Sequence, residues 1–122
     1  MTFREILARI VEETPGALAG AIMSRDGIPV EEFASAQNTV DLSAVAVEFE
    51  RVLDQATKVA GAVFEGSDGV LEELVLGTRG PQLLFHQIDG EYFIVIALER
   101  SGMLGKARYM VRSVLRKVQE EL

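Results

Sequence analysis

Cysteine is absent from this chain of 122 residues. Without thiols the chain forms no disulfides and no thiolate metal sites, and a cysteine nucleophile is excluded. The same absence fits a reducing compartment, and we expect a cytoplasmic protein. The chain has one histidine, His86, which lies in a predicted strand with no acidic pair near it in sequence. We therefore expect a partly buried or surface strand histidine at this position, and no metal site.

Long hydrophobic runs are also missing. No segment approaches the roughly 18 apolar residues of a membrane-spanning helix, and Arg4, Glu5 and Arg9 stand where a signal peptide would be hydrophobic. We expect a soluble protein that is neither exported nor inserted in a membrane. Basic residues are in deficit, because 12 Lys and Arg face 19 Asp and Glu and the formal net charge is −7. This balance argues against a nucleic-acid partner.

Motifs for catalysis and nucleotide binding are absent as well. The 11 glycines fall singly at turns, whereas a Walker loop or a Rossmann fingerprint needs them at phosphate-cradling spacing, and no nucleophile elbow is present. Adjacent acids such as Glu31 and Glu32 would point to opposite faces of a strand and could not share a proton. We expect no catalytic residue and no cofactor, and hence a protein that is not an enzyme.

The basic residues that are present gather near the end of the chain. Residues 106–122 hold 5 of the 12 basic residues and 2 of the 19 acidic ones. One face of the helix predicted there combines Lys106, Arg112, Arg116 and Lys117 with Tyr109. This face could contact phosphates or an acidic partner. The alternative, which we favour at this point, is a solvated surface whose cations suit the helix C-terminus.

Hydrophobic periodicity predicts one domain, residues 1–122, in the order helix, two strands, long helix, three strands, helix. The first helix begins at a capping box of Thr2 and Glu5. The predicted strands are residues 18–23, 28–34, 70–78, 82–88 and 92–98, the long helix is residues 39–65, and Ser101 and Gly102 open the last helix. The fold class is α+β, an α/β/α sandwich. A five-stranded antiparallel sheet carries the long helix on one face and the N- and C-terminal helices on the other.

The two edges of this sheet are expected to differ. Strands 18–23 and 92–98 are apolar without alternation, so both should be central. Pro29 cannot donate to a ladder, which places strand 28–34 at an edge that is closed to further pairing. Strand 70–78 should form the other edge and contains no proline. Glu72 and Glu73 could act there as gatekeepers against aggregation, but we favour pairing with another chain.

The long helix, residues 39–65, has more apolar residues than a single sheet-facing stripe needs. Ser43, Thr57 and Gly61 are small enough to admit a neighbouring helix, so we predict that they lie in a dimer interface. We expect the sheet-facing stripe to consist of Leu42, Val45, Ala46, Phe49, Leu53, Ala56, Ala60, Val63 and Phe64, flanked by Val52 and Val59.

Several local sequences resemble, in their order and spacing, the roadblock family of the dynein light-chain type, and most of all its bacterial MglB-like members. The resemblance covers almost the whole chain. The matching segments are residues 14–21 into the first strand, 25–29 at the hairpin, 42–64 in the long helix, Asp89-Gly90 before the last strand, and 102–106 at the final helix.

This resemblance implies a homodimer in which edge strands pair and two long helices lie antiparallel, forming a platform for small Ras-like GTPases. MglB-like members resemble a GTPase-activating platform that repositions the GTPase's own residues. An arginine finger at Arg51 is the less favoured alternative. On this chain the resemblance would place Glu72, Leu74, Leu76 and Thr78 along the pairing strand, and Val47, Arg51, Gln55 and Lys58 toward the GTPase.

From these observations we expect a non-catalytic homodimeric platform that binds and regulates a small Ras-like GTPase. Two alternatives remain open. One is a nucleotide-independent scaffold or adaptor subunit of a larger complex. The other is a small-molecule sensor, which would need a pocket with convergent polar groups that the apolar central strands do not offer.

Overall fold

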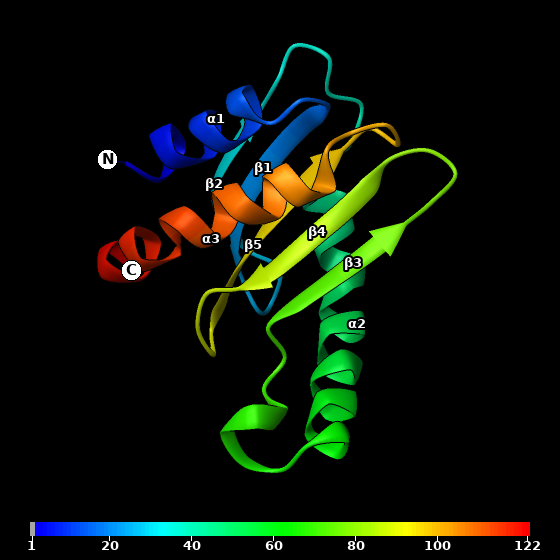
Figure 1. Cartoon of the computed structure of the whole chain (residues 1–122), viewed down its shortest axis with the longest axis vertical. Helices are drawn as coiled ribbons and strands as arrows, with labels where there is room; N and C mark the ends of the chain where they lie inside the picture. The colour runs from blue at the N-terminus through cyan, green and yellow to red at the C-terminus, as the bar shows by residue number, and fades with distance from the viewer. Residues whose placement is uncertain (1) are drawn as a thin grey trace.

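The computed structural model describes residues 2–122, apart from the side chains of residues 67 and 68 (Figure 1). Its elements follow the predicted order, with a short 3-10 helix added after the long helix. They are α1 (Phe3–Glu13), β1 (Ala17–Ser24), β2 (Pro29–Ala34), α2 (Leu42–Val63), η1 (Gly66–Gly69), β3 (Glu73–Gly77), β4 (Gln82–Gln87), β5 (Tyr92–Leu98) and α3 (Leu104–Glu121).

The five strands form one antiparallel sheet in the order β2-β1-β5-β4-β3. The two strands without polar alternation, β1 and β5, are neighbours inside the sheet, as predicted. Helices α1 and α3 cover one face and α2 covers the other (Figure 1). The predicted fold class is therefore confirmed.

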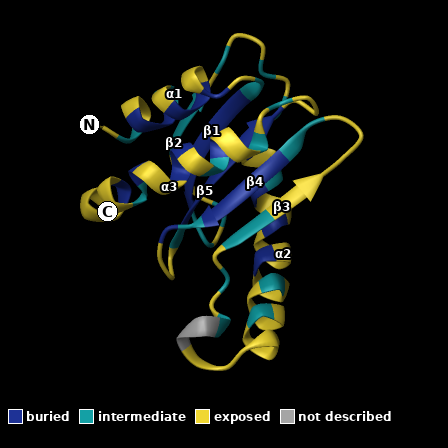
Figure 2. Cartoon of the chain, in the orientation of Figure 1, coloured by how far each residue is buried: buried dark blue, intermediate teal, exposed yellow. Residues whose placement is uncertain are grey.

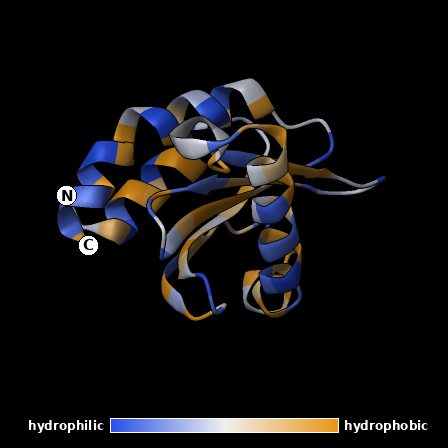
Figure 3. Cartoon of the chain, turned by 90° about the horizontal axis from the view of Figure 1, so that it is seen from below, coloured by the Kyte–Doolittle hydropathy of each residue, from blue (hydrophilic) through white to orange (hydrophobic). Residues whose placement is uncertain are grey.

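Each face of the sheet has its own apolar core. The first core joins Ile6 and Ile10 of α1 and Val111 of α3 to the sheet residues Ile22 and Ile96. The second lies under α2, where the ring of Phe49 stacks on that of Phe85 with centroids 3.7 Å apart. Hydrophobic residues gather where the helices meet the sheet (Figure 3). Continuous apolar sequence in β1 and β5 is explained by these two covered faces.

The turn after α1 and the turn before α3 meet at a close contact between two glycines. Gly16 has a φ of 83°, and a Cβ added to it would lie 2.5 Å from the Cα of Gly102. Backbone bonds from Glu99 to Gly16 and from Met103 to Pro15 join the same two turns. The Pro15-Gly16 turn and the turn before α3 can therefore approach this closely only because glycine stands in both.

Two details differ from the sequence-based expectation. Strand β3 is shorter than the predicted residues 70–78, because residues 70–72, which follow η1, and Thr78 lie outside the strand. The stripe expected under α2 is buried at Leu42, Ala46, Phe49 and Leu53 but ends there. Val63 and Phe64 are 74% and 60% exposed. The prediction for these two was wrong because the C-terminal half of α2 extends past the sheet (Figure 1; Figure 2).

Candidate protein-interaction surfaces

The β2 edge of the sheet is blocked twice. The N–H of Ser35 donates to Leu18, so by strand alternation Glu32 turns its backbone groups outward. The Glu32 N–H donates to the carboxylate of Glu31 at 3.0 Å, and the Glu32 carbonyl accepts from the guanidinium of Arg4 at 3.0 Å. Pro29 has no N–H to offer. Pro29 thus lacks a donor and both backbone groups of Glu32 are already bonded, so this edge is poorly suited to pairing with another strand.

The β3 edge has none of these blocks. The Glu72 carbonyl accepts from Gln87, so by alternation Glu73, Val75 and Gly77 turn their N–H and C=O groups toward the free edge. Val75 is 39% exposed. A regular strand with three outward residues and no proline is able to pair with another strand.

The four residues predicted along the pairing strand take different places. Leu74 and Leu76 lie in β3, and Leu74 packs against the core under α2. Glu72 and Thr78 flank the strand and lie just outside it. The Thr78 hydroxyl donates to the Pro81 carbonyl at 2.6 Å and accepts from an N–H in the same turn, so it orders the turn between β3 and β4.

One flank of α2 is tied to the chain itself. The Ser43 hydroxyl donates to the Glu32 carboxylate at 2.8 Å. The Arg25 guanidinium donates to the Thr57 hydroxyl at 3.1 Å and to the Asp54 carboxylate at 3.3 Å. Both contacts lead toward β2 and the turn that precedes it. The predicted interface residues Ser43 and Thr57 therefore have partners within the chain, and Gly61, one turn after Thr57, is exposed on the same flank.

The other flank of α2 is apolar and faces the β3 side. We define the apolar flank of α2 as Val45, Val52, Ala56, Val59 and Val63. Val52 is 45% exposed and Val59 61% exposed. With Phe49 these residues follow alternating steps of four and three, the heptad spacing of helices that pack side by side. The sequence contained this signal, but Val52 and Val59 were placed at the margin of the sheet-facing stripe. Because the opposite flank of α2 leads toward β2, helix geometry turns this flank toward the other end of the sheet, where β3 forms the free edge.

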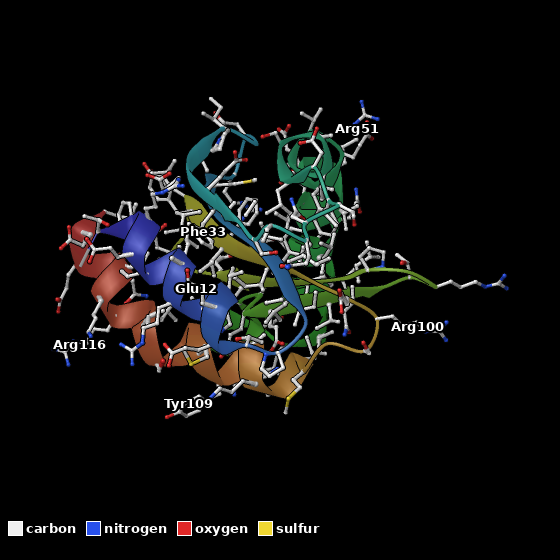
Figure 4. All side chains as sticks on the ribbon, turned by 90° about the horizontal axis from the view of Figure 1, so that it is seen from above. Glu12, Phe33, Arg51, Arg100, Tyr109 and Arg116 are labelled. Atoms are coloured by element: carbon white, nitrogen blue, oxygen red, sulfur yellow. The ribbon has the colours of Figure 1, made fainter. Side chains whose placement is uncertain are left out.

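The outer face of α2 carries the four residues expected to meet a GTPase. Val47, Arg51, Gln55 and Lys58 are all exposed. Figure 4 shows Arg51 pointing away from the sheet. Among the described side chains, which leave out those of residues 67 and 68, neither Arg51 nor Lys58 takes part in an ion pair. The structure thus collects these four side chains on one face that the fold does not use.

His86 is buried, at 2% exposed. Its Nδ1 lies 3.0 Å from the Gln87 carbonyl, while its Nε2 has no hydrogen-bond partner and lies 3.8 Å from the Glu72 carboxylate. Across the described part of the chain, no group of three or more possible metal ligands comes together. No helix in that part is long and apolar enough to cross a membrane.

The basic residues of α3 differ in what they contact. The Arg108 guanidinium lies 2.6 Å from the half-buried carboxylate of Glu73, and Arg112 lies 3.6 Å from the same carboxylate. Arg116 pairs with Glu120 at 3.4 Å on the exposed surface. The last turn of α3 contains no basic residue. The expectation that these cations suit the helix C-terminus was therefore wrong, whereas Lys106, Arg112, Arg116 and Lys117 are exposed, as a solvated surface requires.

Comparison with known proteins gives matches among solved structures. No protein-family model matches the chain, and no curated protein matches it. The crystal structure of MglC from Myxococcus xanthus is similar with 30% identity and a TM-score of 0.73, covering 100% of both chains.

Two further structures share the fold at lower identity. A Roadblock/LC7 domain from Streptomyces avermitilis has 13% identity and a TM-score of 0.81, covering 99% of this chain and 98% of that one. The gliding protein MglB from Thermus thermophilus has 17% identity and a TM-score of 0.82, covering 97% of this chain and 88% of that one.

Proposed function

We propose, starting from the fact that this chain belongs to the roadblock family, that it forms a homodimer which binds and regulates a small Ras-like GTPase. Family membership rests on the likeness to MglC over the full length of both chains. We infer the class of partner, a small GTPase, from the resemblance to MglB-like members. The chain itself would supply a binding surface and no catalytic site.

The observation that carries the proposal is the position of two unused surfaces on one side of the molecule. The free edge of β3 offers the backbone groups of Glu73, Val75 and Gly77. The apolar flank of α2 lies on the same side and exposes Val52, Val59 and Val63. A second copy related by a two-fold axis would cover both surfaces at once, because a two-fold interface uses the same patch on each subunit.

Charge selects the register of the proposed strand pair. With Val75 opposite the partner's Val75, each Glu73 lies opposite a glycine, the partner's Gly77, and the two Glu73 carboxylates stay apart. A register centred on Glu73 would place like charges directly opposite each other, which is destabilising. Leu74 and Leu76 would then face each other across the axis, on the side of the sheet covered by α2. The apolar flanks would take the central place between the long helices, with Ser43, Thr57 and Gly61 farther out.

The GTPase would bind across the outer faces of the two α2 helices. Val47 supplies an exposed apolar contact, and Arg51 and Lys58 supply cations without an ion pair among the described residues. A surface on rigid helices could hold a GTPase's own catalytic loops in place. Stabilising those loops accelerates hydrolysis without an inserted arginine, since most of phosphoryl-transfer catalysis is positioning and electrostatics.

The test is affinity capture with the purified chain from a lysate of the source cell, loaded with GDP in one arm and with a non-hydrolysable GTP analogue in the other. We expect a Ras-like GTPase to be retained, with one nucleotide state preferred. Equal retention in both states would favour the scaffold or adaptor alternative. Absence of any Ras-like GTPase in both arms contradicts the proposal.

A pair of matched variants locates the binding surface. Arg51→Glu with Lys58→Glu reverses two cations on the outer face of α2, and we expect it to lose the GTPase. Arg112→Glu with Arg116→Glu makes the same change in net charge on α3, and we expect it to retain the GTPase. Equal loss in both variants would point to overall charge instead of this surface.

A further inference from the structure

The outward side of α3 carries a cluster of charge that neither the core nor the proposed dimer uses. We define the basic ridge as Lys106, Tyr109, Arg112 and Arg116. Tyr109 is 64% exposed, and the Arg116 side chain is 91% exposed. Figure 4 shows both side chains pointing away from the sheet, on the side of the molecule opposite Arg51. The ridge is therefore separate from the outer face of α2.

Structural contacts within the chain engage the ridge only weakly. The firm ion pair between α3 and the sheet belongs to Arg108, at 2.6 Å from Glu73, and Arg108 lies outside the ridge. Arg112 reaches the same carboxylate at 3.6 Å with its side chain 54% exposed. Arg116 pairs with Glu120 at 3.4 Å, and both of these side chains are exposed. Lys106 lies over the Tyr109 ring, with Nζ 5.6 Å from the centroid. Exposed pairs of this kind contribute little to folding stability.

The distribution of charges along α3 is unfavourable for the stability of the helix. A helix favours anions in its first turn and cations in its last. In α3 the first turn has no acidic residue and contains Lys106, while the last turn has no basic residue and contains Glu120 and Glu121. Its N-cap residue, Met103, makes no side-chain cap bond. Residues that break a local rule without a structural gain are typical of functional surfaces.

We infer that the basic ridge of α3 binds an acidic segment of a partner protein. Charge complementarity carries this assignment, because the ridge is a concentration of positive charge on a chain whose formal net charge is −7. Tyr109 adds an exposed aromatic ring between the cations, a residue type enriched in protein interfaces. The ridge is complete within one chain, so the inference goes beyond the proposed GTPase platform and does not need the dimer.

The neighbouring helix argues against a membrane or a nucleic acid as the occupant. Helix α1 lies beside α3 in the same layer (Figure 1) and exposes three acidic residues, Glu5, Glu12 and Glu13, against two basic ones, Arg4 and Arg9. A flat anionic membrane resting on this layer would meet these carboxylates as well as the ridge. A phosphate backbone would be repelled by the rest of the acidic chain. A peptide segment about as wide as one helix can lie along α3 alone.

The test uses fluorescence anisotropy with a labelled polyglutamate peptide and a polylysine peptide of the same length. We expect the chain to bind polyglutamate and not polylysine, with affinity falling as salt rises. Arg112→Glu with Arg116→Glu should weaken binding roughly tenfold or more, because two attractions are replaced by two repulsions. These positions are exposed, so circular dichroism should report an unchanged fold.

The matched control is Arg51→Glu with Lys58→Glu, which changes the net charge equally on the other side of the molecule. This variant should bind polyglutamate as the unaltered chain does. Equal loss in both variants, or no binding of polyglutamate by the unaltered chain, overturns the inference. Stronger binding to vesicles of anionic phospholipid or to an oligonucleotide than to polyglutamate overturns the choice of occupant. The α3 variant should still retain the GTPase, so failure here is distinguishable from failure of the proposed function.

Discussion

Replacing Val59 by Asp tests whether the apolar flank of α2 is an interface. Val59 is 61% exposed in the single chain. Full burial of a valine side chain contributes about 1.5–3 kcal/mol, so burying the exposed part contributes about 1–2 kcal/mol per copy. Two copies in a dimer give about 2–4 kcal/mol, which raises the dissociation constant roughly 30- to 900-fold. A buried carboxylate adds a further desolvation cost, so this range is a lower bound.

The matched control is Val47→Asp. Val47 is 66% exposed on the same helix but lies on its outer face. Dilution series by light scattering should show that Val59→Asp dissociates at much higher concentration than the unaltered chain, while Val47→Asp keeps its dimer. Circular dichroism should show folded helices in both. Equal weakening of the dimer by both substitutions, or by neither, would refute the assignment of this flank.

Three further predictions follow from the sheet edges and the glycine contact. Val75→Pro should remove a hydrogen-bond donor from the free edge of β3 and abolish the dimer in light scattering. The Leu74 N–H faces β4, so Leu74→Pro should also lower the melting temperature. A stable dimer of the Val75→Pro variant contradicts edge pairing. Arg4→Ala with Glu31→Ala removes the side chains that bond the backbone of Glu32, and this double variant should yield species heavier than the dimer in light scattering. An unchanged mass would show that Pro29 alone closes the β2 edge. Gly16→Ala should destabilise the chain in denaturant unfolding by about 1 kcal/mol or more, because Gly16 has a φ of 83° and an added Cβ would lie 2.5 Å from Gly102. Gly61→Ala, with open space around the added methyl group, should leave stability unchanged or higher. Equal effects at both glycines would contradict the close contact.

Much of the fold was readable because local signals agreed with one another. The apolar runs of β1 and β5 predicted central strands, and Pro29 predicted the closed edge. The Thr2 hydroxyl accepts from the Glu5 N–H, as the capping box required, and Asp41 caps α2. These features depend on neighbouring residues or on simple periodicity, which one sequence contains in full.

The extent of the sheet under α2 could not be predicted from the sequence. Periodicity identifies the apolar side of a helix but says nothing about where the surface beneath it ends, so Val63 and Phe64 were assigned to the core. The roles of Ser43 and Thr57 depend on Glu32 and Arg25, which are distant in sequence and approach only in the fold. The size of these two residues suggested a helix interface, whereas their hydroxyls bond within the chain. The block at Glu32 had no sequence signal, because Arg4 reaches it from another element.

Amide hydrogen exchange at Val75 tests most directly whether the free edge of β3 joins two copies. The Val75 N–H points to the free edge, while the Leu74 N–H faces β4 and serves as the internal reference. We predict that Val75 is protected at high protein concentration and exchanges faster on dilution, while Leu74 keeps its protection. Fast exchange at Val75 at every concentration, with Leu74 protected throughout, would contradict the account.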